Sequence, residues 1–298
     1  MAGLNLFSDL GAIAQTVQED AIFVVRETYV MPGLVTVFND LSSSNTRTGY
    51  KYNQGVAGTI AEGDDLTSQS FVPSADQVLT PYEIGLQFFI SDQRADSSGN
   101  VPESVLIDAA RELGLAAGDK VQNDLLGDLD SLTGGTLGAY GSALAWGHLA
   151  AAIANARAKN KSSSVPLVAV MHGYQWLKLA ASASVAGAST MTQAPQFTEE
   201  MTRKGFVSAF MGVPLVQVYA GTPALQGTGL GDGTGWFTGG VFPRDAIALD
   251  WRRQIRVVAQ RDESRRGVEL NMSAVYAHGV WRPTKGVQFE GFATLPLA

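Results

Sequence analysis

The feature that most constrains this chain is an alternating stretch that begins at Val78 and ends at Ile90. The alternation predicts one strand of about 43 Å at about 3.3 Å per residue, whereas most strands have about 5–6 residues. Pro81 removes a backbone donor, which places the strand at a sheet edge or at a bulge. A strand this long exceeds a small core, so we expect it to project as one side of a hairpin arm. The residues on one face are Val78, Thr80, Tyr82, Ile84, Leu86, Phe88 and Ile90.

The segment before this stretch, GTIAEGDDLTSQSFVPSADQV, is acidic and marked by glycines, which is typical of a hairpin tip. Its carboxylates Glu62, Asp64 and Asp65 are close enough in sequence to bind a cation or to act as acid and base. A DxDxDG pattern is missing, which argues against a calcium loop. A solvated tip is the simplest interpretation. A second interpretation pairs these carboxylates with arginines of another subunit, drawn from Arg252, Arg253, Arg256, Arg265 and Arg266.

Those arginines resemble a nucleic-acid patch only superficially. Asp250, Asp262 and Glu263 are interleaved with them, which favours ion pairs within or between subunits. The net charge of the chain is −7, and residues 1–130 hold 6 Lys and Arg against 19 Asp and Glu. A chain with this acidic balance is a poor candidate for tight, nonspecific DNA binding.

A long amphipathic helix is predicted after the alternating stretch. A cap at Ser98 or Asn100, followed by Pro102, marks its start, and Gly134 marks its end. At about 1.5 Å per residue the helix is roughly 45 Å long. Its apolar residues recur at spacings of three or four and form one stripe, made of Leu106, Ala110, Leu113, Ala117, Val121, Leu125, Leu129 and Leu132.

Shorter elements occupy the rest of the chain. Residues 10–24 and 143–159 have helical patterns, and a third helix is predicted over HGYQWLKLAAS. VPLVAVM and GVPLVQVYAG read as buried strands, and GVELNMSAVYAHGVW alternates as a second long strand. A hairpin arm, a long helix, a middle α/β region and long C-terminal strands together predict an α+β protein.

No local motif indicates catalysis. The absence of cysteine excludes disulfides and thiolate metal sites. His148, His172 and His278 lack a spaced ligand partner, so we expect structural roles for them. The glycine stretch GTGLGDGTGW lacks the Lys-Ser/Thr pair of a phosphate-binding loop, and no GxSxG elbow occurs. The sequence therefore predicts no catalytic residue, no cofactor and no metal site.

The location of the protein is inferred from charge order and hydropathy. Asp9, Glu19 and Asp20 precede the first basic residue, Arg26, which is the reverse of a secretory signal peptide. No apolar run approaches the length of a membrane span. We therefore expect a protein made in the cytoplasm and without a membrane partner.

The order of these parts resembles the major capsid proteins of tailed bacteriophages, which have the Hong Kong 97-type fold. AEGDDLTSQSFVPSADQVLTPYEIGLQFFISDQRADSS looks like the extended hairpin (E-loop) of that family, and SVLIDAARELGLAAGDKVQNDLLGDL sits where its spine helix should be. VAVMHGYQWLKLA, GFVSAFMGVPLVQVYAG and AIALDWRRQIRVVAQRD resemble successive segments of its axial and peripheral domains. AVYAHGVWRPTKGVQF looks like the late strand that ends many of these chains.

The resemblance implies a division into parts. The N-terminal arm would span 1–45 and the E-loop hairpin 46–95. The spine-helix part of the peripheral domain would span 96–134. The axial domain would span 135–243, and the peripheral-domain strands and C-terminus 244–298. Under this interpretation the hairpin is stabilised by lying across a neighbouring subunit. Assembly then buries side chains of the hairpin that stay exposed in a single subunit.

The implied function is self-assembly, as pentamers and hexamers, into an icosahedral virion shell around double-stranded DNA, in the cytoplasm of a host bacterium. The implied subunit-interface residues are Glu62, Asp64, Asp65, Tyr82, Phe88, Arg252, Arg253, Arg265 and Arg266.

The implied partners are a portal, a decoration protein, and packaged DNA held by weak nonspecific contact. Two departures from the family pattern are expected to matter. No lysine occurs between Lys51 and Lys120, so the hairpin tip cannot supply the lysine that some members cross-link to a neighbour. About 45 residues precede the hairpin, too few for a fused scaffolding domain, which favours a separate scaffolding protein.

Three alternatives remain open at this stage. The first is an encapsulin-like nanocompartment shell, which shares the fold and would hold cargo enzymes. The second is a cytosolic α+β enzyme, which would need a catalytic cluster that the sequence does not show. The third is a phage tail or baseplate protein, which would share the long strands.

Overall fold

The structure is a computed structural model of the 298-residue chain. It describes residues 30–39, 46–52, 55–63, 65, 68–93, 102–138, 142, 144–185, 209–218 and 236–292. The expected opening helix over 10–24, the helix-capping residues Ser98 and Asn100, and the glycine stretch 227–235 lie outside these ranges. Within them no helix is long and apolar enough to cross a membrane.

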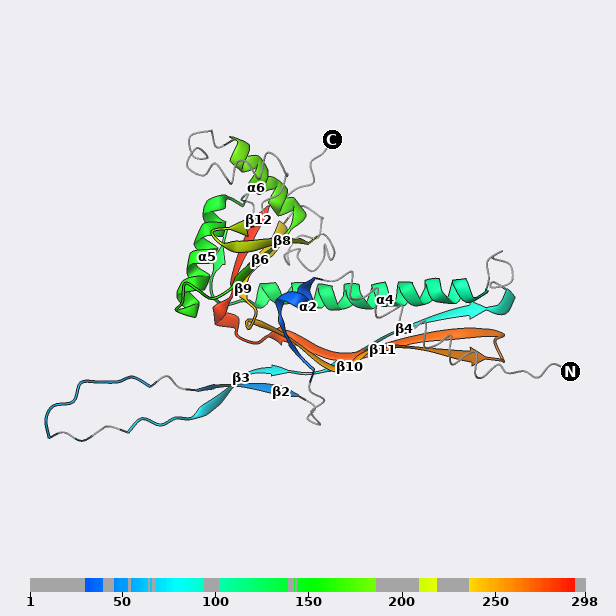
Figure 1. The fold of residues 1–298 in the computed structure, drawn as a ribbon, viewed down its shortest axis with the longest axis horizontal. Helices are drawn as coiled ribbons and strands as arrows, with labels where there is room; N and C mark the ends of the chain where they lie inside the picture. The colour runs from blue at the N-terminus through cyan, green and yellow to red at the C-terminus, as the bar shows by residue number, and fades with distance from the viewer. Residues whose placement is uncertain are drawn as a thin grey trace.

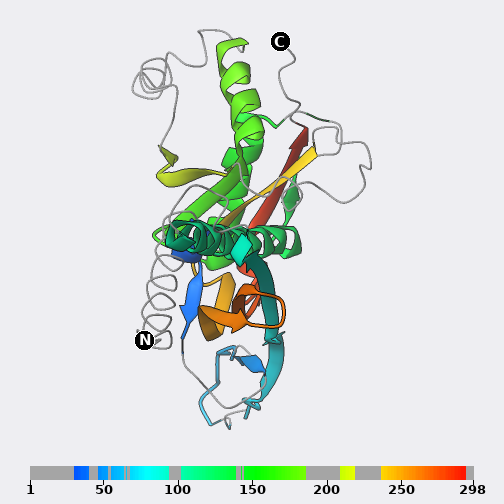
Figure 2. The same ribbon diagram turned by 90° about the vertical axis from the view of Figure 1, so that its right-hand side faces the viewer.

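A four-stranded sheet and one long helix form the elongated body on the right of Figure 1. The helix α4 spans Pro102–Gly127 and continues as a 3-10 turn, η1, over Asp128–Ser131. The eight positions of the expected stripe are buried, with 9% of their surface exposed or less. The helix ends earlier than the expected Gly134, because Leu129 lies in η1 and Leu132 follows it in an extended conformation. Figure 2 shows α4 end-on, lying over the sheet. In sheet order the strands are β1 (Thr36–Phe38), β10 (Ile247–Asp262), β11 (Gly267–Val280) and β4 (Tyr82–Ser91).

The single strand expected over 78–90 is wrong, because the chain forms two strands there. β3 (Pro73–Leu79) pairs with β2 (Arg47–Tyr52), whereas β4 pairs with β11 in another sheet. The break falls at Thr80 and Pro81, where proline has no N–H to continue a ladder. The arm is therefore the β2–β3 hairpin alone, and β4 is part of the elongated body.

The predicted inner face of β4 is largely confirmed. Tyr82, Ile84 and Phe88 pack against the main core, and Ile90 is buried within it. Leu86 is the exception, with 37% of its surface exposed. The alternating pattern therefore predicted correctly which side of β4 faces the core. It did not predict that the strand is interrupted at Thr80 and Pro81.

A six-stranded sheet with two helices forms the second body, at the top of Figure 1. The helix predicted over 143–159 is confirmed as α5 (Trp146–Asn160), and VPLVAVM forms the buried strand β6 (Leu167–His172). The α6 helix (Gly173–Val185) follows β6 directly. In sheet order the strands are β5 (Thr136–Leu137), β12 (Val287–Phe292), β9 (Trp236–Pro243), β6, β8 (Val213–Val218) and β7 (Ala209–Phe210).

One core cluster joins the two bodies. It contains the α4 stripe, Trp251 and Tyr276 of the elongated body, and Val170 and Phe242 of the second sheet. The short helix α2 (Met31–Leu34) contributes a fully buried methionine to the same cluster. Another short helix, η2 (Pro283–Lys285), follows β11. The hairpin leaves the molecule where the two bodies meet and runs away from both (Figure 1).

Candidate subunit interface

The foot of the hairpin is anchored in the elongated body by a buried ion pair. Arg47, the first residue of β2, places its Nε 3.0 Å from Oδ2 of Asp250 on β10. The Asp250 side chain is fully buried, and Arg252 lies 2.9 Å from the same carboxylate oxygen. Leu79, the last residue of β3, packs with Ala248 of β10 in a small buried cluster. The foot therefore has a fixed place on the body.

Beyond the foot, the hairpin has little of its own chain to pack against. The side chain of Gln69 accepts a hydrogen bond from the Val56 backbone N–H at 3.0 Å and donates one to the Val56 carbonyl at 2.8 Å. Tyr52 and Phe71 stack with ring centroids 4.6 Å apart. These contacts hold the two sides together, yet Phe71 is 72% exposed and Val56 is 71% exposed. Large apolar groups left open along a projecting arm are typical of an interaction surface.

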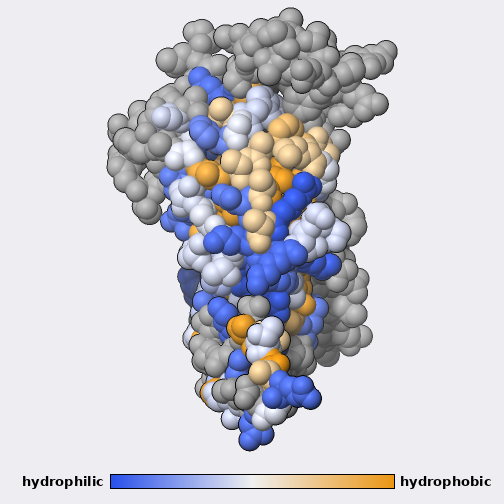
Figure 3. All heavy atoms as spheres, turned by 90° about the vertical axis from the view of Figure 1, so that its left-hand side faces the viewer, coloured by the Kyte–Doolittle hydropathy of each residue, from blue (hydrophilic) through white to orange (hydrophobic). Residues whose placement is uncertain are grey.

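Hydrophobic residues are visible on the arm from outside. Figure 3 views the molecule from the hairpin side, and hydrophobic residues lie among hydrophilic ones on its lower part, where the hairpin points towards the viewer. The exposed large hydrophobic residues of the hairpin are Tyr50, Tyr52, Val56, Ile60, Phe71, Val72 and Val78.

The acidic residues lie at the turn of the hairpin, as expected. Gly63 adopts a φ of +93°, a left-handed conformation that favours glycine, and it reverses the chain. Glu62 and Asp65 are exposed, whereas Asp64 lies outside the described residues. Among the described residues neither Glu62 nor Asp65 forms an ion pair. Their carboxylates are therefore available to a second molecule.

Three of the five arginines expected to meet the tip already have carboxylate partners in their own chain. Arg252 pairs with Asp250, Arg253 with Glu83, and Arg265 with Glu269 at 3.0 Å. The Arg265 guanidinium also lies 4.3 Å from the centre of the Phe89 ring. The expectation of ion pairing among these residues is thus met within one subunit.

The tip and the arginines lie on separate parts of the molecule, since the hairpin runs away from the body that carries the arginines (Figure 1). The remaining members of the set, Arg256 and Arg266, are both exposed, and Arg266 has a φ of +50°. Pairing between the tip of one copy and an arginine of another stays a prediction.

Tyr82 and Phe88, also expected at an interface, pack inside their own subunit. The Tyr82 hydroxyl donates a hydrogen bond of 2.5 Å to Oδ2 of Asp124, and Phe88 packs against the main core. Whether a neighbour also contacts either residue stays a prediction.

Tyr82 belongs to a group that we call the polar cluster, which links α4 and η1 to β4 and β11. The Tyr276 hydroxyl donates to the same Asp124 oxygen at 2.6 Å, and Lys120 donates to the other oxygen at 2.5 Å. Burial opposes the charged form of Asp124, but the hydrogen bonds from Lys120, Tyr276 and Tyr82 outweigh it and hold its pKa below the ordinary value. The members are Tyr82, Lys120, Asp124, Asp128, Tyr276 and His278.

His278 is the histidine for which sequence reasoning missed a carboxylate partner. Its Nδ1 lies 2.9 Å from Oδ2 of Asp128, and its Nε2 lies 3.9 Å from Asp124. Burial lowers the pKa of His278, but the hydrogen bond and charge of Asp128 outweigh burial and raise it. Burial is also the main cause of the raised pKa of Asp128. The residues come from separate parts of the sequence, so no local motif signals them.

The other two histidines have the structural surroundings that we expected. His172 is buried and stacks on Phe237 with centroids 4.0 Å apart, and burial lowers its pKa. The His148 Nδ1 accepts a hydrogen bond of 3.3 Å from the Ala145 backbone N–H at the start of α5. Within the described part of the chain, no group of three or more acidic or histidine side chains is arranged to hold a metal ion.

Comparisons with known proteins show which solved structures share this fold. No family model matches the chain, and no curated protein matches it. A chain of Mycobacterium phage Che8 is 20% identical, with a TM-score of 0.65 over 88% of this chain and 91% of that one. The capsid of cyanophage P-SCSP1u is 14% identical, with a TM-score of 0.68 over 90% and 88%. A virus-like particle from Pyrococcus furiosus is 8% identical, with a TM-score of 0.58 over 92% and 98%.

Each of these three matches covers 88% or more of both chains. The protein has the mixed helix-and-sheet, Hong Kong 97-type fold of phage capsids, which confirms the resemblance drawn from the sequence.

Proposed function

We propose that this protein is a major capsid protein, which self-assembles into the icosahedral shell that encloses the double-stranded DNA genome of a tailed bacteriophage. The observation that carries the proposal is the projecting hairpin, whose exposed residues include Phe71 at 72% and Val56 at 71%. A two-stranded hairpin is marginally stable on its own in water. Its apolar surface therefore favours a neighbouring subunit, and the shared fold supports a shell as the assembly.

Assembly under this proposal depends on many weak contacts. Copies form rings of five and six around the six-stranded body, and the hairpins tie each copy to the next. Each hairpin contact can be weak, because many contacts act together in a closed shell. The Asp250 anchor holds the foot, so the arm leaves each subunit in a defined direction.

We propose that the parts of the subunit follow the family pattern. Residues 1–45 serve as an N-terminal arm, the β2–β3 hairpin as the E-loop, 135–243 as the axial domain, and α4 with the C-terminal strands as the peripheral domain. The interface residues inferred from the sequence, Glu62, Asp64, Asp65 and the arginines, remain part of this proposal. A separate scaffolding protein, a portal and a decoration protein are the proposed partners, and packaged DNA makes weak, nonspecific contact. Assembly takes place in the host cytoplasm.

A second candidate is an encapsulin-like nanocompartment shell. The observation that favours it is the match to the virus-like particle from Pyrococcus furiosus, which spans 98% of that chain. The two candidates share subunit geometry and differ in what the shell contains. An enzyme or a tail component is not favoured by any of the structural matches described above.

Electron microscopy of the purified protein, with and without a co-expressed scaffolding protein, tests this proposal. The expected result is closed shells, which contain DNA when they are isolated from infected or induced cells. Shells that contain enzyme instead of DNA would support the nanocompartment. Small discrete oligomers under every condition, measured by sedimentation velocity, would contradict both.

A further inference from the structure

The strand β4 forms an open edge of the four-stranded sheet. It pairs with β11 on one side, and in the part of the chain that the structure describes no strand pairs with it on the other side. Figure 2 shows β4 at the margin of the elongated body, on the opposite side of the sheet from β1. Gly85, Leu86 and Gln87 in the middle of the strand are exposed. The edge is therefore accessible to a second molecule.

The pairing with β11 shows which backbone groups of β4 point outwards. Asp92, directly after β4, donates its N–H to the Arg266 carbonyl at 3.0 Å, and the same register continues to Tyr82 without a shift. Opposite residues of an antiparallel pair exchange hydrogen bonds at every second position. The even-numbered residues of β4 therefore bond to β11. The odd-numbered residues direct their N–H and C=O groups away from β11, and these residues include Glu83, Gly85, Gln87 and Phe89.

This edge lacks the features that keep most edge strands from pairing. Natural edges are blunted by charged side chains, prolines or bulges. The residues from Ile84 to Ile90 include no charged residue and no proline, and no bulge interrupts their pairing with β11. Leu86 lies on the same face of the strand as Ile84 and Phe88, which pack against the core, yet it is 37% exposed. A long, uncharged edge of this kind is a template for another strand.

The core-facing side of β4 matches a second copy of the same strand. An antiparallel pair centred on Leu86 places Ile84 of one copy opposite Phe88 of the other, and Tyr82 opposite Ile90. Leu86 then lies opposite its own counterpart. These positions share one face by alternation, so an apolar or aromatic side chain meets another at every pair. Such cross-strand pairs stabilise sheets, and this pairing covers the exposed part of Leu86.

The other face of β4 is complementary in charge under the same pairing. Glu83 of one copy lies opposite Phe89 of the other, and the Arg265 guanidinium covers that ring at 4.3 Å from its centre. A carboxylate therefore approaches a cation on both sides of the axis. Both groups keep the partners that they have in their own chain, so they favour this register without being its main source of stability. Gly85 lies opposite Gln87, and no like charges face each other.

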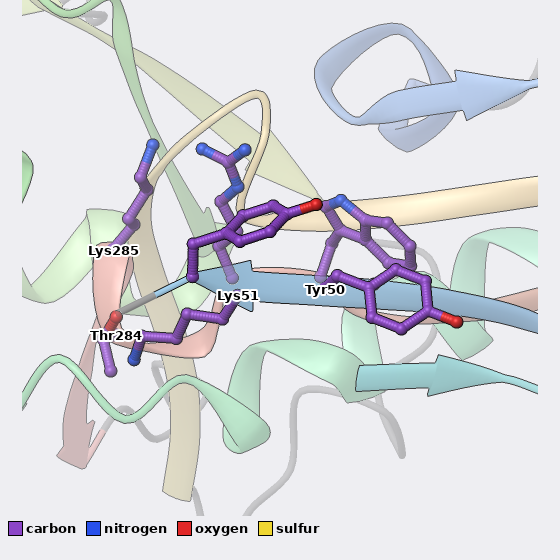
Figure 4. A pocket seen from close by; sticks show the side chains of 8 residues that line it. Tyr50, Lys51, Thr284 and Lys285 are labelled. Atoms are coloured by element: carbon purple, nitrogen blue, oxygen red, sulfur yellow. The ribbon is translucent and has the colours of Figure 1, made fainter. Parts of the chain in front are cut away.

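The surface also has a pocket at the foot of the hairpin, where β2 meets the η2 turn. Figure 4 shows Lys51 of β2 facing Thr284 and Lys285 of the turn. Arg282 and Lys285 pair with Asp245, and Lys51 also has an interaction within its own chain. The cations of this pocket are therefore satisfied within the subunit, whereas β4 offers a row of backbone groups that no described strand pairs with.

We propose that β4 of one copy pairs with β4 of a second copy about a two-fold axis at Leu86, so that two four-stranded sheets become one continuous sheet. This inference rests on the proposed function and adds a contact that the hairpin does not make. A contact between identical surfaces joins only two copies, so it links copies of neighbouring rings. One strand edge is small beside the about 1,200–2,000 Å² that stable interfaces bury, so many such contacts act together in a shell.

Disulfide trapping tests the position of the axis, because the chain has no cysteine. The two Leu86 residues would face each other at a non-hydrogen-bonded position, where Cα atoms lie about 4.5 Å apart, which suits a disulfide. After oxidation of assembled Leu86→Cys protein, we expect covalent dimers on a non-reducing gel. Val258→Cys is the matched control, because Val258 is also 37% exposed and lies on β10, two strands from β4. This control should stay monomeric.

The outcomes separate the inference from the function on which it rests. Shells of Leu86→Cys that form normally but give no dimer overturn the inference and leave the proposed function standing, as would happen if a hairpin or another protein covers the edge. Dimers from Val258→Cys alone overturn it in the same way. Dimers of Leu86→Cys in protein that forms no shells support the strand contact and contradict the proposed function. Protein that forms neither dimers nor shells overturns both.

Charge substitutions give a second readout. Leu86→Lys and Leu86→Glu each place like charges directly opposite each other, so each should raise the protein concentration needed for assembly about tenfold. An equimolar mixture of the two should assemble at a concentration within about threefold of wild type, because opposite charges then face each other. Val258→Lys should assemble like wild type. Thermal unfolding of each unassembled variant checks that it is folded. Single variants at Leu86 that assemble like wild type, or a mixture no better than its components, would count against the axis.

Discussion

At the scale of single residues, the polar cluster makes the stability of the subunit depend on pH. His278 lies between Asp124 and Asp128, and Lys120 is the cation that faces it across the cluster. The folded-state pKa of His278 is above its ordinary value of 6.5. Protonation of this imidazole therefore favours folding. The stabilisation is complete below about pH 6.5 and is lost as the pH rises through the folded-state pKa.

His278→Gln should remove this part of the pH dependence. We expect the free energy of unfolding of the wild-type subunit to fall as the pH rises above about 6.5, and that of the variant to fall less. Urea denaturation of unassembled protein at several pH values measures the difference. Asp128→Asn should also reduce the fall of the free energy of unfolding over this pH range. Combining it with His278→Gln should reduce the fall little further, because both residues belong to one interaction. Parallel curves for wild type and His278→Gln would contradict the assignment.

At the scale of elements, glycine sets how closely β4 and β11 approach. A side chain at Gly267, the first residue of β11, would place its Cβ 2.5 Å from the Ile90 carbonyl oxygen and 2.6 Å from the Phe89 ring. Real Cβ atoms do not approach a backbone oxygen so closely, so the strands would have to separate there. Gly127 at the end of α4 differs, because no atom from another part of the chain lies within 4 Å of the place that a Cβ would occupy there.

Gly267→Ala should destabilise the subunit by about 1–3 kcal/mol, which is the usual cost of overpacking. Gly127→Ala has a helical φ of −61° and open space, so it should be neutral or stabilising by up to about 1 kcal/mol. Thermal or urea unfolding of the two variants compares them directly. Equal effects of both substitutions would show that the close approach at Gly267 does not control stability.

At the scale of the whole molecule, the core and the arm have separate sources of stability. One buried cluster runs from the α4 stripe into the six-stranded body and includes Phe242 and Val170. The hairpin contributes to burial chiefly at its foot, through Leu79 and the Arg47–Asp250 pair. Its distal part is therefore expected to add little to the stability of an isolated subunit.

Replacing residues 55–70 with an Asn-Gly turn tests this separation. We expect the free energy of unfolding of the isolated subunit to change by less than about 0.5 kcal/mol, as for other exposed changes. Assembly into shells should be lost, because the arm and its tip are missing. Unfolding experiments measure the change in stability, and electron microscopy of the same preparation shows whether shells form. Normal shells from the shortened chain would show that the arm is not an essential contact.

Most of the fold could be predicted from periodicity. Eight positions of the α4 stripe, from Leu106 to Leu132, were predicted as one buried face, and all are buried. A helix core of this kind depends on spacing within one segment, which a sequence displays directly. The alternating stretch around Pro81 shows the limit. Its pattern continues across two strands of different sheets, and only the missing proline donor hinted at the break.

The candidate site was less predictable. The acidic tip and the aromatic arm are local features, so the sequence indicated them. The polar cluster brings Tyr82, Asp124 and His278 together from positions up to about 200 residues apart in the sequence. Such gatherings depend on the pairing of β4 with β11 and of the hairpin foot with the body, which no local pattern specifies.

The sequence by itself determined the parts: the arm, the long helix, the long C-terminal strands and the acidic turn at Glu62. Each depends on periodicity or composition within one segment, where neighbours in the chain are neighbours in space. The tertiary structure alone decided which charges are satisfied within the subunit. It paired Arg252 with Asp250 and His278 with Asp128, and it left Glu62 without a partner among the described residues. Long-range packing sets those distances, and Coulomb interactions depend on distance rather than on order in the chain.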